Sequence, residues 1–448
     1  MDQLDFLGPL SKARPRDTAR RWLATQPPVV SWRGTFLAYS AGNYSPVDIR
    51  EYREQLDRWL EAQREIVQRG QGTAEIPYRV TKDNSTEVLD AAAGLCLIPD
   101  RVELPTWTLP GERELPICLQ DGLLYPSIRT VLPHVPQFVG TSKLPFEWGD
   151  GTPEDCPKWK EFLAIDWTPA QVEYFQEWCG YLLASHRRFQ KFMLIQGPPR
   201  SGKGTILDVL TALVGEGNTY PCDLQTFSTK YLDDHFPVAQ MIVVADARSS
   251  GGKTESGAAL EFLLKLVGND PLRFERKYRN AWSGKPVGKL VIMSNMVPPF
   301  QDASGALSAR TCLFQRKTSF TGREDTELGK KLAKEIRGIF FWALEGLERL
   351  EKRGRFDQSS EPALLVETFA HTSNPVGQFV AEETRPGGSV LLRHLYERWL
   401  LWCRVTGTHN NLRAIQFLTA VLQCGGYEVS GRGRDLEVVG IEMKGAME

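Results

Sequence analysis

The segment that decides the fold of this chain is KFMLIQGPPRSGKGT, residues 191–205. It contains Phe192 to Ile195, an apolar run whose length is typical of a buried strand. A turn rich in glycine and proline follows, and residues 206–214 then have the composition of a helix. The segment therefore predicts a strand, a loop and a helix in immediate succession, within an α/β fold.

The loop fits the pattern G-x-x-x-x-G-K of a phosphate-binding loop. Glycines let backbone N–H groups approach a triphosphate, the following helix points its positive end at the phosphates, and lysine reaches the β- and γ-phosphates. We expect nucleotide binding by Gly197, Pro198, Pro199, Arg200, Ser201, Gly202, Lys203, Gly204 and Thr205. The hydroxyl comes one position later than usual, and this GKGT variant also occurs in nucleoside monophosphate kinases. The loop therefore indicates a nucleotide more firmly than a helicase.

Composition limits the partners and the compartment. The 448 residues, 42% hydrophobic and 24% charged, suit about two to four globular domains. A net charge of −1 gives no overall attraction to nucleic acid, so a DNA partner must meet a local basic patch. No apolar run approaches the roughly 20 residues that cross a bilayer, and the start lacks a signal-peptide pattern. We therefore expect no membrane partner. Because the eight cysteines form no C-x-x-C pair, we expect reduced thiols, no zinc and a cytoplasmic location.

Residues 1–150 predict a mixed α/β accessory domain. Residues 35–45 have the pattern of an aromatic hairpin, and a helix is expected from there to about Arg69. Closely spaced carboxylates on a strand, as an archaeo-eukaryotic-type primase site requires, do not occur in this part of the sequence. We therefore expect primer synthesis to be absent or to be contributed by another protein.

Two further apolar runs end in polar residues that suit phosphate chemistry. Residues 241–245 are followed by Asp246, and residues 290–293 by Ser294 and Asn295. An acid at such a strand end can hold Mg²⁺ or orient water, and an amide there can reach the γ-phosphate. Arg310 lies downstream, where its spacing fits either an arginine finger or a structural ion pair.

A basic segment, residues 271–289, contains aromatic side chains among its cations. Gly284 and Pro286 favour a hairpin over a long helix. Its cations include Arg276, Lys277, Arg279 and Lys285, and its aromatic residues are Phe274, Tyr278 and Trp282. Cations that bind phosphates and aromatic side chains that stack on bases suit a contact with single-stranded nucleic acid. The alternative is a charged hairpin that is simply exposed to solvent.

The linker predicted at residues 145–158 is rich in proline, glycine and acids, and a second is predicted at residues 356–362. A capping box at Thr168 begins a helix that leads into the phosphate-loop strand. The tail predicts three helices and a hairpin with Arg432 and Arg434 at its tip, which is a winged-helix pattern. Such a module binds DNA or docks protein, and both alternatives stay open.

In their order these motifs resemble the phage- and plasmid-type primase-helicases related to poxvirus helicase-primases, in helicase superfamily 3. The resemblance rests on GPPRSGKGT (197–205), VVADAR (243–248), FERKYRNAWSGK (274–285), LVIMSNMVPPF (290–300) and DASGALSAR (302–310). It continues through SFTGRED (319–325) to NPVGQFV (374–380), and upstream through CPKWKEFL (156–163) and EWCGYLL (177–183).

The resemblance implies an AAA+-like P-loop ATPase core at 191–355, with a helical helicase-associated segment at 156–190. An α/β accessory domain would precede these parts, and a winged-helix domain at 363–448 would follow them. Such proteins form rings, here a homo-hexamer, that use ATP and Mg²⁺ on single-stranded or forked DNA in replication of a mobile element, with a separate primase or initiator as partner. A bacterial host cytoplasm is implied.

Carried over by residue, Lys203 and Thr205 serve the phosphates and Mg²⁺, Asp246 is the Walker B acid, and Asn295 is sensor 1. Arg310 is the finger for a neighbouring subunit. The DNA contacts predicted are Arg276, Lys277, Tyr278, Arg279, Lys285, Arg432 and Arg434.

Two other functions fit parts of this pattern. Because a single acid stands where two are common, the chain also fits an ATP-switched DNA-binding initiator that hydrolyses slowly. The GKGT loop also fits a small-molecule kinase, but residues 222–236 lack the arginine-rich lid that such an enzyme needs.

Overall fold

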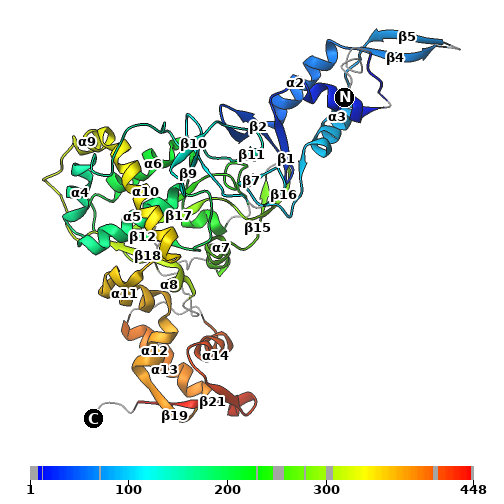
Figure 1. Ribbon diagram of the computed structural model, residues 1–448. Helices are drawn as coiled ribbons and strands as arrows, with labels where there is room; N and C mark the ends of the chain where they lie inside the picture. Colours follow the sequence, from blue (N-terminus) through cyan, green and yellow to red (C-terminus); the bar gives the residue numbers. More distant parts are fainter. Residues whose placement is uncertain are drawn as a thin grey trace.

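The computed structural model describes residues 9–12, 14–69, 72–111, 113–228, 231–245, 257–276, 279–298, 306–406 and 412–444. An N-terminal unit and a C-terminal unit extend from different sides of a central body (Figure 1). The body is built on a parallel sheet with the order β13-β14-β17-β12-β18. Its strands are β12 (Phe192–Gln196), β13 (Thr219–Cys222), β14 (Met241–Val244), β17 (Lys289–Ser294) and β18 (Thr311–Gln315). The strand, loop and helix predicted at residues 192–214 are confirmed.

The register of the sheet brings the carboxyl ends of three strands together. Gln196, at the end of β12, is paired with Ser294 of β17 on one side and with Gln315 of β18 on the other. All the side chains of β14 and β17 are buried, as expected for a parallel sheet covered on both faces. The loop that follows β12 therefore lies beside the residues that follow β17.

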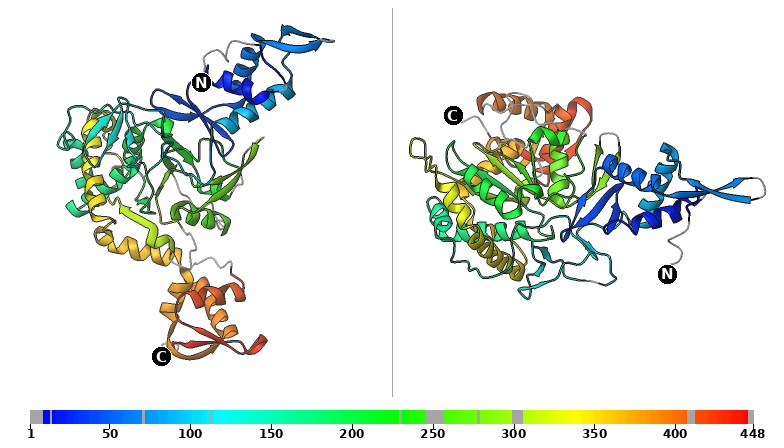
Figure 2. Two further views of the ribbon diagram at one scale, coloured as in Figure 1. Left: turned by 45° about the vertical axis from the view of Figure 1, so that its right-hand side comes forward. Right: turned by 90° about the horizontal axis from the view of Figure 1, so that it is seen from above.

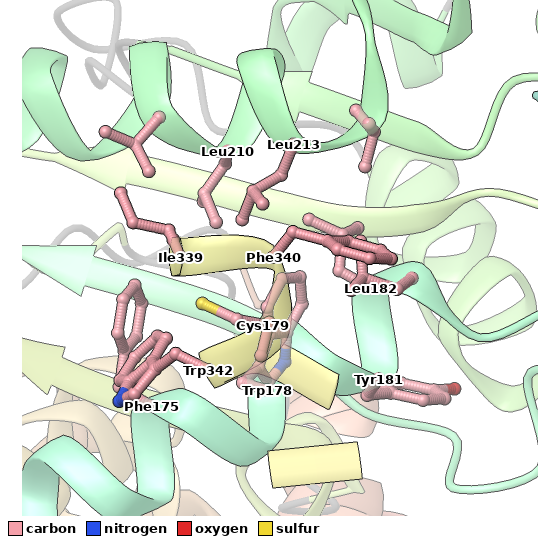
Figure 3. Packing of buried hydrophobic residues seen from close by; sticks show 14 of the residues in the cluster. Phe175, Trp178, Cys179, Tyr181, Leu182, Leu210, Leu213, Ile339, Phe340 and Trp342 are labelled. Carbon is pink, nitrogen blue, oxygen red and sulfur yellow. The ribbon is translucent and has the colours of Figure 1, made fainter. Parts of the chain in front are cut away.

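One face of the sheet is covered by helices from both sides of the phosphate loop in the sequence. They are α4 (Pro157–Ala164), α5 (Pro169–Leu183), α6 (Lys203–Val214), α9 (Leu328–Lys334) and α10 (Ile336–Arg353). Figure 3 shows aromatic and aliphatic side chains of α5, α6 and α10 packed in one buried cluster. The axes of α5 and α10 approach closely at Gly180 and Gly346. A Cβ at Gly180 would lie 2.4 Å from the carbonyl oxygen of Ala343, so a larger residue would push the helices apart.

The opposite face is covered by elements that come between the strands or after them. They are η3 (Leu224–Ser228), α7 (Gly257–Gly268), α8 (Ala306–Arg310), α11 (Ala363–Ser373) and the hairpin of β15 (Leu272–Arg276) and β16 (Arg279–Gly284). Side chains alternate along the strands, so that Leu194 and Ile292 belong to this second cluster while Met193 and Ile195 belong to the first. The sheet is therefore the middle layer of three.

The N-terminal unit has its own small core. Its elements are α1 (Pro15–Leu23), β1 (Val29–Trp32), β2 (Thr35–Ser40), β3 (Asn43–Pro46), α2 (Ile49–Glu61), β4 (Arg64–Arg69), β5 (Gly72–Pro77), α3 (Lys82–Leu95) and β6 (Leu97–Ile98). The predicted hairpin at residues 35–45 is confirmed, and Ala41 and Gly42 turn it with φ values of 49° and 101°.

The helix predicted to reach Arg69 is wrong in its second half. The helix α2 starts after the capping residue Asp48 and ends at Glu61. Residues 64–69 instead form β4, which pairs with β5 in a ribbon that projects from the molecule (Figure 2). The β-branched pair Ile66 and Val67 and the glycine-rich connection RGQG favour a hairpin over a helix.

The segment between the N-terminal unit and α4 packs onto the body. It contains β7 (Thr106–Trp107), β8 (Ile117–Cys118), β9 (Leu123–Tyr125), β10 (Thr130–Leu132) and β11 (Phe138–Val139). Ile117, Leu124 and Phe146 belong to the same buried cluster as α5 and α10. The predicted linker at residues 145–158 is therefore part of this packing, and the core continues across the predicted boundary at residue 150.

The C-terminal unit has a separate core, which includes Phe379, Trp399, Phe417 and Ile441. Its elements are α12 (Pro375–Glu383), β19 (Thr384–Leu391), α13 (Leu392–Thr406), α14 (Ala414–Gln423), β20 (Glu428–Ser430) and β21 (Glu437–Met443). The strands form an antiparallel sheet with the order β19-β21-β20. The three helices and the final hairpin agree with the prediction, whereas β19 was not predicted. Across the described parts of the chain, no helix combines the length and apolar character needed to cross a membrane.

Candidate functional site

The phosphate loop has two residues in the left-handed region of backbone space. Arg200 has a φ of 58° and Gly202 a φ of 84°. A Cβ at Gly202 would lie 2.7 Å from Cζ of Phe162, and a Cβ at Gly197 would lie 2.6 Å from the carbonyl oxygen of Arg316. Close packing therefore excludes a side chain at both glycines of the motif, and at Gly202 the left-handed backbone favours glycine as well.

Lys203 lies inside the curve of the loop and contacts the neighbouring strand end. Its Nζ donates to the carbonyl oxygens of Gly197, at 2.6 Å, and Pro198, at 2.8 Å. It also donates to Oδ1 of Asn295 at 2.9 Å. The backbone N–H of Gly197 donates to the carbonyl oxygen of Ser294 at 3.1 Å, which fixes the loop to the end of β17. The residues predicted to bind phosphate and to act as sensor 1 are thus in direct contact.

A cavity of about 1060 Å³ opens beside the loop. Besides the loop it is lined by Phe162, Ile165, Leu207, Asn295, Phe320, Arg323, Leu328 and Lys331, among others. The apolar side chains lie on α4 and the residue after it, on α6 and α9, and in the segment before α9. The lining also contains charges of both signs, among them Arg323, Lys331 and Asp325. Nζ of Lys331 donates to Oδ2 of Asp325 at 2.6 Å, which lowers the pKa of that carboxyl. The volume and lining suit a nucleotide whose phosphates lie against the loop.

A buried ion pair braces the loop from behind, and sequence reasoning did not find it. Nε of Arg316 lies 3.0 Å from Oδ2 of Asp166, and both side chains are almost completely buried. The same guanidinium donates to the carbonyl oxygens of Ser201 and Phe162, each at 3.2 Å. Arg316 directly follows β18, which pairs with β12. A cation at this strand end was therefore the sequence feature that could have indicated a contact with the phosphate loop.

The segment after β18 also contacts the loop. The backbone N–H of Phe320 donates to the carbonyl oxygen of Arg200 at 2.8 Å. The hydroxyl of Ser319 donates to the carbonyl oxygen of Pro199 at 3.0 Å. This segment belongs to the SFTGRED motif, to which no role was assigned from the sequence. It forms part of the cavity wall and holds the outer side of the loop.

Of the two predicted magnesium ligands, Thr205 and Asp246, the structure describes only Thr205. Thr205 lines the cavity, close to Lys203, where a hydroxyl can reach a phosphate-bound cation. Asp246 lies outside the described residues, two positions beyond the end of β14. In the described ranges no cluster of three or more histidine, cysteine or acidic side chains is arranged to hold a metal.

Arg310 lies at the amino ends of the sheet strands, whereas the phosphate loop lies at their carboxyl ends. It ends α8, and the next residue, Thr311, pairs with Phe192 at the start of β12, whereas the loop follows Gln196. At about 3.3 Å per residue, the length of β12 separates these two ends of the sheet by roughly 15 Å. Nη1 of Arg310 donates to the carbonyl oxygen of Leu264 in α7 at 3.0 Å. Arg310 is therefore not positioned for the cavity of its own chain.

The predicted hairpin is present, but part of its predicted DNA-binding role does not fit the structure. Arg276 is only 5% exposed, and its Nη1 lies 2.8 Å from Oδ1 of Asp234 and 2.7 Å from the hydroxyl of Thr35. Its guanidinium joins the hairpin to the N-terminal unit. We therefore correct the assignment of Arg276 from a DNA contact to a structural contact, because a buried and paired cation cannot reach a DNA phosphate.

The aromatic residues of the hairpin also differ from the expectation. Phe274 and Trp282 are opposite each other, stacked at 5.0 Å and buried, so they are core residues and not platforms for bases. Lys285 follows β16 at the base of the hairpin, far from its tip. Lys277 and Tyr278 lie outside the described residues, and Arg279 begins β16 next to them.

The C-terminal unit places Arg432 and Arg434 as predicted, in the exposed connection between β20 and β21. The helix α14, AIQFLTAVLQ, contains no charged residue. The positive charge of this hairpin therefore lies on its tip and not on the adjacent helix.

Comparison with known proteins agrees with this architecture. Residues 195–310 match the model of a family of unknown function (DUF5906), a span from the phosphate-loop strand to Arg310. The apo structure of the NrS-1 C terminal region (305-718) is 11% identical, with 96% of this chain and 99% of that chain covered and a TM-score of 0.50. The A form apo structure of the same region gives 11% identity, 96% and 100% coverage, and a TM-score of 0.49.

A structure of the JCV helicase bound to a small molecule is 18% identical over 51% of this chain and 61% of that chain, with a TM-score of 0.30. At these identities the likeness concerns the fold alone. The match with a TM-score of 0.50 shows that the mixed α/β fold of this chain, with its parallel sheet, is similar to the fold of the NrS-1 C terminal region.

Proposed function

We propose that this chain is an ATP-dependent, ring-forming DNA helicase that acts in replication of a mobile genetic element. The observation that carries the proposal is the contact between Lys203 and Asn295 beside a cavity large enough for a nucleotide. A lysine in a phosphate loop and an amide at the next strand end are the groups expected around a γ-phosphate. The fold likeness to the NrS-1 C-terminal region is consistent with this proposal.

ATP hydrolysis by such a site depends on positioning and charge neutralisation. Lys203 would bind the β- and γ-phosphates, Thr205 would hold Mg²⁺ together with Asp246, and Asn295 would orient the γ-phosphate or the attacking water. Mg²⁺ supplies positive charge at the β- and γ-oxygens when it is bound. Because Arg316 donates to the carbonyl oxygen of Ser201, it would hold the loop in place during the reaction.

The position of Arg310 supports a ring in which subunits share sites. Arg310 is separated from the cavity of its own chain by the length of a strand, so it would serve the cavity of a neighbouring subunit. An arginine supplied in this way stabilises the charge that develops on the transferred phosphate. A homo-hexamer, as the sequence resemblance implies, would place one such arginine at each cavity.

The hairpin β15–β16 supports a contact with single-stranded DNA at its tip. In the sequence it is inserted between β14 and β17, the strands that Asp246 and Asn295 follow. Lys277 and Tyr278, which connect β15 to β16 in the sequence, and the next residue, Arg279, would contact the DNA backbone and bases. A separate primase or replication initiator is the partner we expect.

The experiment is DNA-stimulated ATP hydrolysis together with strand displacement from a forked duplex. Wild type is expected to do both, Lys203→Ala neither, and Lys277→Ala to hydrolyse ATP without displacing a strand. Lys352→Ala, an exposed lysine on α10, is the matched control and should behave as wild type. Normal displacement by Lys277→Ala would reject the DNA role of the hairpin. ATP hydrolysis without displacement by wild type would favour an ATP-switched initiator.

A further inference from the structure

The strand that follows Arg310 lies at the edge of the sheet, and side chains of the segment after α10 pair with its outer side. Nε2 of Gln358 donates to the carbonyl oxygen of Thr311 at 2.9 Å. The backbone N–H of Leu313 donates to Oε1 of Glu361 at 2.9 Å. Two side chains therefore occupy backbone groups that a further strand would otherwise pair with.

Lys191 extends this arrangement to the residue before Arg310. Its Nζ donates to the carbonyl oxygen of Ala309 and to Oε1 of Gln358, each at 2.5 Å. We call Lys191, Gln358 and Glu361 the clasp. The clasp holds backbone groups on both sides of Arg310, at positions 309 and 311, and leaves the arginine side chain itself uninvolved.

Contacts with α5 of the central body and with the helix α11 hold the clasp in place. The hydroxyl of Tyr174 in α5 donates to Oε1 of Glu361 at 2.7 Å, and burial raises the pKa of this carboxyl. The helix α11 begins two residues after Glu361 and packs on α8, where Leu365 and Phe369 share a buried cluster with Leu307. The helix α8 is short, with only five residues, and such a helix has little stability of its own. The direction of Arg310 therefore depends on what surrounds α8.

We propose that the clasp positions Arg310 for the triphosphate of the neighbouring subunit, so that Lys191 and Gln358 are positioning residues of a site in another chain. This inference rests on the proposed function, because it needs Arg310 to act between subunits. It goes beyond that function because it assigns a role at the neighbour's nucleotide to Gln358 and Glu361, in the segment between α10 and α11. A hydrogen bond from Nη1 of Arg310 to the carbonyl oxygen of Leu264 fixes one side of the guanidinium, while the clasp fixes the backbone.

The test uses full-length subunits mixed in pairs. Acceptor subunits carry Arg310→Ala and keep an intact cavity, while donor subunits carry Lys203→Ala and keep an intact arginine. Each is inactive alone, and mixing is expected to restore ATP hydrolysis where a donor arginine meets an acceptor cavity. Adding Gln358→Ala to the donor should lower the restored kcat by about tenfold and leave KM for ATP nearly unchanged.

The matched control adds Gln358→Ala to the acceptor instead. It should leave the restored rate unchanged, because the clasp of an acceptor positions an alanine. A merely structural role would lower both mixtures equally, and that result would overturn the inference. Lys191→Met, which keeps the aliphatic stem, gives an independent second variant with the same expected asymmetry, and melting temperatures show that each variant is folded. Failure of the simple donor and acceptor to complement would reject the shared site itself, and the clasp's role with it.

Discussion

Nζ of Lys203 donates to Oδ1 of Asn295 at 2.9 Å, across 92 residues of sequence. The contact exists because β12 and β17 are parallel neighbours whose ends are in register, so the residue after one strand lies beside the loop after the other. It places a fixed charge and an oriented amide at the same point of the cavity. The chemistry proposed for the site depends on this pairing.

Asn295→Ala is expected to lower kcat for ATP by about 10- to 100-fold, because a hydrogen bond to a charged group contributes about 1.5–3 kcal/mol. The KM for ATP should change little, since the loop still binds the phosphates. Steady-state ATP hydrolysis checks this. Gln315→Ala is the matched control, because it removes an amide at the end of β18 that donates to Gln196 at the end of the neighbouring strand. Equal losses in the two variants would contradict the assignment.

The two glycines that flank Lys203 are expected to differ in their tolerance of a methyl group. Gly202→Ala should weaken nucleotide binding and lower the melting temperature, because φ is 84° and the new Cβ would lie 2.7 Å from Phe162. Gly204→Ala should be neutral or stabilising by about 0.5–1 kcal/mol, because it is in α6 and no atom lies within 4 Å of its Cβ position. Titration with a fluorescent ATP analogue and thermal unfolding test both. A Gly204→Ala variant that binds worse than Gly202→Ala would show that the loop changes shape with nucleotide.

Lys289→Met is expected to stabilise the protein at neutral pH. Lys289 is 2% exposed at the start of β17, and its burial, with the nearby Arg187, lowers its pKa well below the usual value. The unfolded chain binds a proton at this position that the folded chain binds more weakly, so the wild-type free energy of unfolding rises with pH up to the ordinary lysine pKa, about 10.4. The advantage of methionine, about 1–3 kcal/mol, should therefore shrink as pH rises from 7 to 10.

Urea unfolding of Lys289→Met at pH 7 and pH 10 measures this difference. Lys330→Met, at a lysine that is 76% exposed, is the control and should change stability little at either pH. An advantage that grows with pH would show that Lys289 is charged in the folded protein and stabilised by its hydrogen bond to the carbonyl oxygen of Ala184.

Arg432→Ala combined with Arg434→Ala is expected to weaken DNA binding mainly through lost phosphate contacts. If both arginines contact duplex phosphates, the slope of log K against log salt concentration should become smaller by about 1.8. Fluorescence anisotropy over a range of salt concentrations measures the slope. An unchanged slope would favour the other predicted role of the C-terminal unit, which is docking to a protein, and the uncharged helix α14 would then be the surface to test.

Short-range features of this fold follow from the sequence because they depend on neighbouring residues. The capping box at Thr168, the turn at Ala41 and Gly42, and the strand and loop that end at Lys203 are all present as predicted. Each is set by backbone preference or by hydrogen bonds within a few residues, so it does not depend on the rest of the chain. The same reasoning failed at residues 64–69, where β-branched residues and pairing with β5 outweighed the helical pattern.

The tertiary structure alone decided which of the polar residues meet. Charge and spacing could not distinguish Arg276, which is buried against Asp234, from a cation exposed at the hairpin tip. They also could not reveal that Arg316 pairs with Asp166, 150 residues earlier in the chain, and braces the phosphate loop at the carbonyl oxygen of Ser201. The order and register of the strands fix these contacts, and strand order is set by the burial of two apolar faces of a sheet. The sequence by itself determined that a nucleotide loop exists, and the packing of the sheet determined which groups surround it.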